Sequence, residues 1–375
     1  MNPTDCRHQL HRMAEPSQHE EKTKEFILKQ LQECSPTRIH TFPDNHNLVA
    51  EYFFDDKGPT ILLRADFDAV PVAETLPLEY ASENPAVAHK CGHDGHTAIL
   101  LGLAARLAQA KENKTLSGRI LLFFQEAEEI GAGAAKLLNS DLLQQFKIDK
   151  VYALHNIPGY PLGSIICKEG SFTCSVISCE IKMEGVTAHA AEPHTGISPF
   201  GALTRVAETA LQWTQSNLEH DDYQIVTLIG LQIGGADYGV AAGSGALRLT
   251  LRAKNDRLLK KRISEIEELL RVETQHEPRL KSEVRWLEYF AESKNNPSAV
   301  EKIRSAAAAN SLPYIEKKQP FAWGEDFGLL TQHYPGAMFG LGAGEHCPNL
   351  HHHDYDFPDE IIPAGIKMFW ELIGS

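Results

Sequence analysis

The sequence predicts an α/β protein made of a large domain and a smaller inserted one. The large domain would contain a mostly parallel sheet with helices on both faces, and the inserted domain would be ferredoxin-like (β-α-β-β-α-β). Short apolar runs alternate with amphipathic helical segments over residues 47–157, as in a sheet covered on both faces. The order of elements changes near residue 174, and a length of 375 residues suits two domains or one large one.

Four segments of the first part are expected to be strands, because they are short, mostly apolar and bounded by turns or helices. They are "NLVAEYFF" (47–54), "TILLRADF" (60–67), "GRILLFFQ" (118–125) and "KVYALHN" (150–156). Between them, residues 95–111 and 131–143 are expected to be helices. In the first of these, Ile99, Leu100, Leu103 and Leu107 recur at helical spacing.

The segment 174–289 has the order of a complete small domain. Strands are expected at 175–184, 223–234, 245–254 and 279–289, and helices at 198–215 and 256–277, which gives the β-α-β-β-α-β order. Helices at 296–311 and 358–373 and a strand at 336–344 follow. We therefore expect residues 1–173 and 290–375 to form one discontinuous domain, with 174–289 inserted into it.

Composition narrows the classes of function. The net charge of −14 argues against a nucleic-acid partner, which a basic surface would favour. No apolar run approaches the roughly 20 residues that span a bilayer, and the polar start of the chain lacks an apolar leader, so a cytoplasmic protein without a membrane partner is expected. Seven cysteines, an odd number without a CxxC pair, make a disulfide framework improbable.

Metal-capable side chains gather where strands are expected to end. "HKCGHDGHTA" (89–98) places Cys91 and His93 in a loop just before a helix, "EAEE" (126–129) follows a buried strand, and His155 ends another. His351 follows the last expected strand. Any one of these groups alone is weak, since loop histidines are commonly surface residues and acids favour helix starts. Together, thiolate, imidazole and carboxylate form a zinc-type ligand set, at the end of the sheet where ligands bind.

Two further features concern proton transfer and domain closure. Glu128 and Glu129 are adjacent in an irregular segment, so one carboxylate could hold metal while the other moves protons. "EGVTAHAAEPHTG" (184–196) in the inserted domain holds His189 and His194. These are either two surface histidines or part of a closing element that carries an electrophile to the site.

Taken together, the motifs resemble those of the aminoacylase-type dinuclear metallopeptidase family. They are similar above all to its amidohydrolase branch, which includes hippurate hydrolases and hydrolases of auxin conjugates (indole-acetyl-amino acids). The resemblance rests on "RADFDAVPV", "HKCGHDGHTAILLGLA", "FFQEAEE", "GAGAAKLL", "ALHN", "GVTAHAAEPHTGISP", "GEDFGLL" and "LHHHDYDFPDE", in family order over about residues 60 to 360.

This resemblance implies two divalent metal ions per subunit, Zn²⁺ or Mn²⁺ with Co²⁺ or Ni²⁺ as further options. The implied ligands are Cys91, His93, Glu129, His155 and His351. It also implies that Glu128 is the general base, and that His189 reaches the site of the other subunit in a homodimer formed through the inserted domain. Asp94 is expected to cap the helix that follows, and His96 to lie in its first turn outside the ligand set.

Some positions depart from the family pattern. Glu126 stands where proline is common, and Asp66-Phe67-Asp68 stands where the wider family often has His-x-Asp, a loss for which the branch compensates with Cys91. Gly239 replaces an asparagine that helps to bind substrate. We therefore expect a metal-dependent enzyme that hydrolyses the amide bond of small N-acyl-amino acids. The alternatives are a dipeptidase or other N-deacylase, and a metal-binding protein that has lost catalysis.

Overall fold

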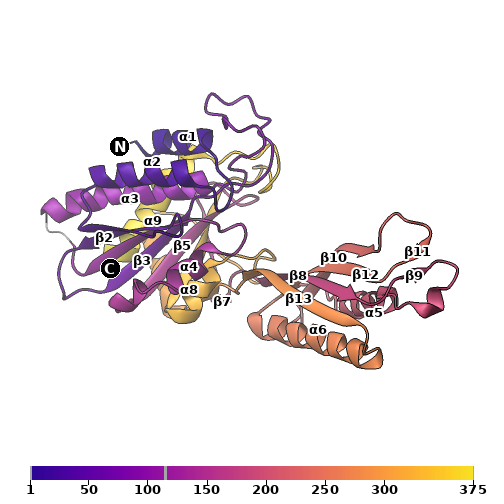
Figure 1. Ribbon diagram of the computed structural model, residues 1–375. Helices are drawn as coiled ribbons and strands as arrows, with labels where there is room; N and C mark the ends of the chain where they lie inside the picture. The colour runs from indigo at the N-terminus through magenta and orange to yellow at the C-terminus, as the bar shows by residue number, and fades with distance from the viewer. Residues whose placement is uncertain (1, 114–115, 375) are drawn as a thin grey trace. The chain divides into compact units, whose positions relative to one another are not determined.

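A computed structural model describes residues 2–113 and 116–374 of the chain. The chain divides into two compact units. The first comprises Met1–Phe172, Ser293–Lys318 and Glu325–Ser375, and the second comprises Thr173–Glu292 and Gln319–Gly324. Both units are labelled by element in Figure 1.

The first unit is built on one large mixed sheet that is parallel at its centre. Its strands, in spatial order, are β1 (Arg38–Thr41), β2 (Leu48–Phe53), β4 (Arg119–Gln125), β3 (Thr60–Asp66), β5 (Lys150–Ile157), β16 (Gly336–Gly342), β6 (Ile165–Cys167) and β15 (Tyr314–Glu316). The neighbours β4, β3, β5 and β16 run parallel to one another, as do β6 and β15. The remaining pairs are antiparallel. This arrangement confirms the predicted fold class.

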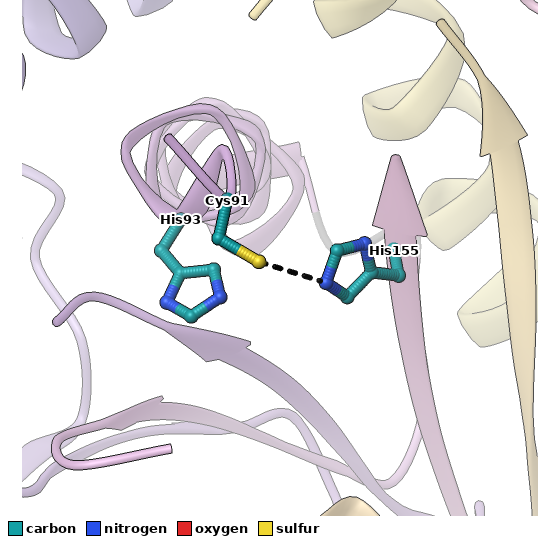
Figure 2. A group of neighbouring side chains, drawn as sticks. All are labelled: Cys91, His93 and His155. Carbon is teal, nitrogen blue, oxygen red and sulfur yellow. Dashed lines mark hydrogen bonds between the residues drawn. The ribbon is translucent and has the colours of Figure 1, made fainter. Parts of the chain in front are cut away.

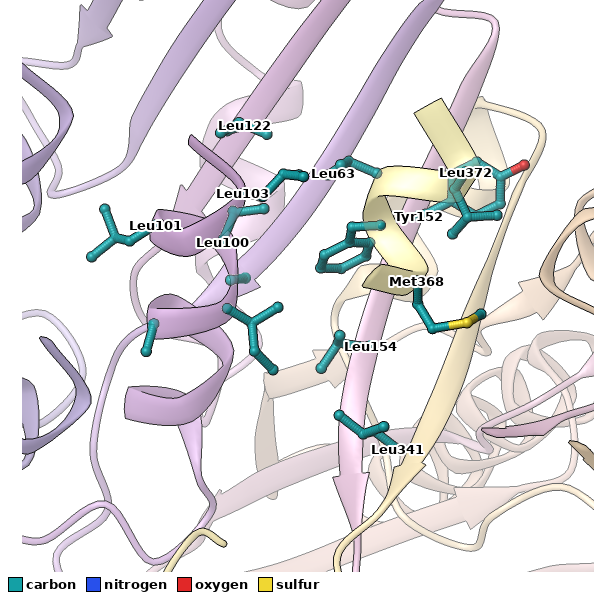
Figure 3. Close-up of a cluster of buried hydrophobic side chains, with 14 of the residues drawn as sticks. Leu63, Leu100, Leu101, Leu103, Leu122, Tyr152, Leu154, Leu341, Met368 and Leu372 are labelled. Carbon is teal, nitrogen blue, oxygen red and sulfur yellow. The ribbon is translucent and has the colours of Figure 1, made fainter. Parts of the chain in front are cut away.

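Helices cover both faces of this sheet (Figure 1). One face shares a core with α1 (Pro3–Arg12), α2 (Glu21–Glu33), α3 (His93–Asn113), α7 (Pro297–Ala309) and α9 (Ile362–Gly374). The short helices α4 (Gly133–Leu138) and α8 (Phe327–His333) lie on the other face. Figure 3 shows Leu63, Tyr152 and Leu154 of the strands packed against leucines of α3 and Met368 of α9. Burial of these side chains fixes α3, and with it the loop that precedes α3.

The second unit has the predicted β-α-β-β-α-β order. Its elements are β8 (Ser175–Glu184), α5 (Phe200–Leu211), β10 (Gln224–Ile233), β12 (Ser244–Ala253), α6 (Asp256–His276) and β13 (Lys281–Phe290). The strands form an antiparallel sheet in the order β10-β12-β8-β13. Apolar residues of α5 and α6, among them Leu203 and Ile266, share a separate core with alternate residues of β8 and β12. Alternation at period two is what a sheet with one buried face requires.

The remaining elements are short. They are β7 (Gly170–Ser171) paired with β14 (Lys294–Asn295), β9 (Ala188–His189) paired with β11 (Val240–Ala241), and the 3₁₀ turns Leu143–Gln145, Pro193–Thr195 and Asp359–Ile361. The helix expected over 131–143 is correspondingly shorter, since α4 ends at Leu138 and a turn at Asn139 and Ser140 separates it from the 3₁₀ segment. None of the described helices is both long and apolar enough to cross a bilayer.

Asparagine is the N-cap residue, directly before the first helical residue, of three of the helices. Asn2 accepts a hydrogen bond from the Thr4 N–H ahead of α1, and Asn296 accepts one from the Ser298 N–H ahead of α7, with proline as the first helical residue in both cases. Asn255 accepts from the Leu258 N–H ahead of α6. Such caps satisfy backbone donors that a helix leaves unpaired at its start. The helix α1 packs on α3 and brings N-terminal side chains close to the predicted site.

Candidate metal centre

The five predicted ligand residues all belong to the first unit and come together at the carboxyl ends of its parallel strands. Cys91 precedes α3, His93 is its first residue, Glu129 follows β4, His155 lies in β5 and His351 follows β16. Potential ligand atoms of Cys91, His93 and His155 lie within 4.8 Å of one another, and so do those of Cys91, Glu129 and His351. The thiol of Cys91 is therefore common to two groups of ligands.

Individual distances define this cluster more closely. The Sγ atom of Cys91 lies 3.6 Å from Nε2 of His155, as Figure 2 shows. The Oε1 atom of Glu129 lies 3.7 Å from Nε2 of His93 and 3.3 Å from Nε2 of His351. Cys91, His93 and His155 are buried, Glu129 is partly exposed, and the side chain of His351 is about half exposed. The cluster is thus buried on one side and reachable from solvent on the other.

Hydrogen bonds outside the cluster orient two of the imidazoles. The Nδ1 atom of His93 lies 3.1 Å from Oδ1 of Asp68 and 3.0 Å from its backbone oxygen, and Nδ1 of His155 lies 2.9 Å from the backbone oxygen of Asn156. Because each Nδ1 faces an oxygen acceptor, the Nε2 of each ring is the nitrogen that faces the cluster and could bind a metal. Metal-binding histidines are commonly fixed in this way.

The donor set fits divalent cations. The Nε2 atom of His93 is buried and has no hydrogen-bond partner among the described residues, although it faces the carboxylates of Glu129 and Asp66, each at 3.7 Å. A buried polar atom without a partner is costly, and a cation between these groups would satisfy it. Thiolate, imidazole and carboxylate are the donors that zinc-type ions prefer.

Electrostatics around the cluster point the same way. Burial raises the pKa of the Cys91 thiol well above its ordinary value, and the carboxylates of Glu129 and Glu128 raise it further. Burial and the neighbouring His96 lower the pKa of His155, which favours the neutral imidazole that binds metal. Burial opposes the charge of His93, but the carboxylates of Asp66 and Asp68 outweigh it and raise its pKa to about 10. A bound dication would supply the positive charge that these carboxylates attract.

The loop that carries Cys91 needs a glycine. Gly92 has φ of +94°, and a Cβ there would lie 2.8 Å from the side-chain amide of Asn156 and 2.9 Å from the Tyr355 hydroxyl. The neighbouring Lys90 is buried and ties two loops together. Its Nζ donates to Glu74 Oε1 at 2.7 Å, and its backbone oxygen accepts from the His351 N–H at 2.7 Å. His351 itself has φ of +64°.

Glu128 is buried beside the cluster. Its Oε1 faces the backbone N–H of Asp326 at 3.4 Å. Burial raises its pKa well above the ordinary value, and the carboxylates of Glu325 and Glu129 raise it further, which increases its affinity for a proton.

Asp94 is the second residue of α3 rather than the residue before the helix. Its Oδ1 accepts the N–H of Gly95 at 2.9 Å, so it still satisfies one backbone donor in the first turn. The Asp94 carboxylate points inward and lies 3.2 Å from Nη1 of Arg7 and 2.8 Å from Nδ1 of His11. A buried carboxylate needs such partners, and nothing in the local motif indicated that α1 would supply them.

His96 lies in the first turn of α3, as expected. Its Nδ1 is 2.6 Å from Oδ1 of Asp66, and its Nε2 is 2.5 Å from the side-chain oxygen of Asn156. Asp66 also accepts from Nη1 of Arg64 at 2.7 Å. Both ring nitrogens of His96 are therefore already engaged by buried partners.

In the second unit, His189 is exposed and lies in β9, opposite Val240 of β11. Its Nδ1 accepts a hydrogen bond from the Ala191 N–H at 3.0 Å, which leaves Nε2 as the protonated nitrogen. The backbone oxygen of Gly239 accepts a hydrogen bond from the N–H of Ala190. Gly239, which departs from the family pattern, therefore lies next to the segment that carries His189. A Cβ at Gly239 would meet open space. The nearby His194 is also exposed.

The chain is similar to known hydrolases over nearly all of its length. Residues 62–375 match the family model of peptidase family M20/M25/M40. The chain belongs to this family. It is 33% identical over 374 residues to an N-acetyl-L-cysteine deacetylase of Bacillus subtilis (97% of this chain, 86% of that protein). It is 30% identical over 369 residues to an N-acetyldiaminopimelate deacetylase of Exiguobacterium sibiricum (97% and 96%).

A solved structure extends the likeness to the whole fold. The Bacillus subtilis YXEP protein, described as a dinuclear metal-binding peptidase of family M20, is 28% identical and superposes with a TM-score of 0.80 over 99% of this chain and 96% of that one. Membership of the M20 family, together with the two overlapping ligand groups, identifies the chain as a metal-dependent hydrolase of amide bonds. The predicted resemblance and class of enzyme are thereby confirmed.

Proposed function

We propose that this M20 enzyme removes a short acyl group, acetyl above all, from the nitrogen of an amino acid, and that it does so at the cluster around Cys91. The products are a carboxylic acid and a free amino acid. The observation that carries the assignment is the placement of four imidazole and carboxylate donors around the buried thiol of Cys91, with the carboxylate of Glu128 beside them. The deacetylase names of two relatives support the choice of acyl group.

In this proposal Cys91, His93, Glu129, His155 and His351 hold two divalent cations. Bound cations would polarise the amide carbonyl and make a water molecule acidic enough to attack at neutral pH. Glu128 takes a proton from the attacking water and delivers it to the amide nitrogen as the C–N bond breaks. The burial of Glu128 and the carboxylates around it raise its proton affinity, as this task requires.

The choice of metal follows from the thiol. A thiolate favours softer ions, so we propose Zn²⁺ in the site next to Cys91, with Mn²⁺, Co²⁺ or Ni²⁺ as further occupants. Metal content measured on the purified protein, and restoration of activity by single ions after chelation, test this choice.

We also propose a homodimer formed through the second unit, in which His189 serves the partner's site. Support comes from β10, which ends the sheet. In the part of the chain that the structure describes, its partners are β12 and, at its first residue Gln224 alone, a bridge to Gln215. Leu228, Ile229 and Leu231 of β10 are exposed apolar side chains. An edge strand of this kind is poised to pair with another chain.

The cytoplasm is the proposed location. All seven cysteines lie within the described residues and all are free thiols. Six of them are buried, which is usual for proteins of reducing compartments.

The roles of the two adjacent glutamates are tested together. Glu128→Gln should keep both metals and lose at least about 100-fold in kcat, the contribution of a positioned acid-base group. Glu129→Gln should lose metal. Amine release from N-acetyl-L-cysteine, other N-acetyl-amino acids, hippurate and simple dipeptides is the assay, with metal content measured in parallel. Near-normal turnover by Glu128→Gln would show that Glu128 is not the general base. Faster cleavage of dipeptides than of every N-acyl substrate would identify the enzyme as a dipeptidase.

A further inference from the structure

The turn that carries Glu128 and Glu129 has a backbone conformation that its sequence does not favour. Ala127 is fully buried and has φ of +50°. This left-handed region costs a residue with a Cβ about 1 kcal/mol or more. Such a conformation persists only where neighbouring groups hold it, so the partners of Ala127 bear on where the next two side chains point.

Glu20 is the side chain that holds Ala127. Its Oε1 accepts the backbone N–H of Ala127 at 2.9 Å, although 107 residues separate them in the sequence. Glu20 directly precedes α2, and its side chain is fully buried. Its other oxygen lies 3.1 Å from Nδ1 of His46, so the carboxylate is fixed at both ends. If Glu20 were removed, the buried N–H of Ala127 would lose this acceptor.

The same N-terminal segment also reaches Glu129. The hydroxyl of Ser17 donates to Oδ2 of Asp68 at 2.7 Å, and that oxygen accepts the backbone N–H of Glu129 at 3.0 Å. The other oxygen of Asp68 lies 3.1 Å from Nδ1 of His93. Two side chains three residues apart, Ser17 and Glu20, therefore act on the residues that flank Glu128.

The segment that carries them is itself anchored. Pro16 and Ala69 form a bridge between their backbones, and the Ala69 N–H donates to the backbone oxygen of Glu15 at 2.9 Å. The Oε2 atom of Glu15 accepts both the N–H and the hydroxyl of Thr23, at 2.9 and 3.0 Å. A firmly held segment can impose a conformation on the turn it contacts.

We propose that Glu20 is a positioning residue for the reaction. By accepting the N–H of Ala127 it keeps the turn in its left-handed conformation, and so directs Glu128 to the reacting atoms and Glu129 to the metals. Ser17 supports Glu129 through Asp68. This inference rests on the proposed roles of Glu128 and Glu129.

The test compares Glu20→Ala, Glu20→Gln and the matched control Glu21→Ala. Glu21 is the adjacent carboxylate, but its side chain is 64% exposed. The readouts are the metal dissociation constants from competition with a chelating indicator, kcat and KM with N-acetyl-L-cysteine, and the unfolding temperature. Glu20→Ala should weaken metal binding by about 10- to 100-fold, the usual effect of removing a group that orients a ligand, and should lower kcat more than it changes KM.

Glu20→Gln should stay within about threefold of the wild type, because its amide oxygen can still accept the Ala127 N–H. Glu21→Ala should match the wild type. The proposal would be overturned if Glu20→Ala kept wild-type metal affinity and kcat and showed only a lower unfolding temperature. It would also be overturned if Glu20→Gln were as impaired as Glu20→Ala. If Glu128→Gln were active, the proposed function would fail, but the metal affinity of Glu20→Ala would still report on Glu129.

A second pair of variants covers the case in which Glu20→Ala does not fold. Glycine adopts positive φ without strain, so Ala127→Gly should make the turn less dependent on Glu20. The double variant Glu20→Ala/Ala127→Gly should fold and regain part of the metal affinity. If it gains neither folding nor affinity over Glu20→Ala, Ala127 is not the residue through which Glu20 acts.

Discussion

Because of His11, the first unit should lose stability as the pH rises from about 6.5 to about 9. The imidazole is fully buried between two carboxylates, with Nδ1 2.8 Å from Asp94 and Nε2 2.8 Å from Glu74. Burial opposes its charge, but the hydrogen bonds to Asp94 and Glu74 outweigh burial and raise its pKa from 6.5 to about 9. The pKa of Glu74 falls to about 2 because hydrogen bonds from His11, Lys90 and the Leu76 N–H outweigh its burial. The part due to His11 is the same interaction and is not counted twice.

The size and the sign follow from linkage. Each tenfold change in proton affinity is worth about 1.4 kcal/mol, so the interval between 6.5 and about 9 corresponds to about 3 kcal/mol. Because the pKa is raised in the folded state, this stability is fully present below pH 6.5. It is lost as the pH rises toward 9, where the folded protein releases the proton as well.

Urea unfolding followed by circular dichroism, at fixed metal concentration, measures this dependence. Wild type and His11→Asn are compared between pH 6 and 9.5, with His19→Asn as a control because His19 is exposed. His11→Asn should be less stable than the wild type by several kcal/mol at pH 6, and the difference should shrink by about 3 kcal/mol by pH 9.5. A difference that is constant with pH would show that His11 contributes packing alone and would refute the argument.

Two further predictions concern the proposed centre. Cys91→Ala should lose at least one metal, and a variant that binds two metals as tightly as the wild type would contradict the role of Cys91 as a ligand. Peroxide should also inactivate the metal-free wild type faster than the metal-loaded enzyme, because an unligated thiolate is open to oxidation. Equal amounts of Glu128→Gln and His189→Ala, after random exchange of subunits, should recover about a quarter of wild-type activity, since half of the dimers are mixed and each holds one site with both groups intact. Demonstrated exchange without recovery would exclude a shared His189.

The sequence was sufficient for the fold class, and the residues that it predicted as ligands lie close together in the structure. Strand and helix periods are local signals, and they placed β3, α3, β4 and β5 within a few residues. The grouping could be predicted because Glu129 follows β4, His155 lies near the end of β5 and Cys91 directly precedes α3, at the edge of the sheet where the carboxyl ends of its parallel strands meet. The choice among ligands, base and bystanders came instead from the family resemblance, which carried information that spacing alone does not.

What could not be predicted are the contacts between distant segments. Arg7 and His11 are more than 80 residues from Asp94, so the local motif suggested the contact of Asp94 with the helix start but not its buried ion pair. The partners Ser17–Asp68 and Glu20–Ala127 are of the same kind. No spacing rule links a polar N-terminal segment to a strand end, because only the packing of α1 and α2 beside α3 brings them together.

Glu126 shows why a departure from a family pattern need not mean loss of function. Its N–H donates to the Asn47 side chain at 3.0 Å, a bond that a proline could not make. Its carboxylate is buried but satisfied, since Oε1 accepts from Lys136 Nζ at 2.7 Å and Oε2 accepts the His46 N–H at 2.8 Å. His46 in turn contacts Glu20. The unusual residue thus joins the set of contacts that fixes the turn before Glu128 and Glu129.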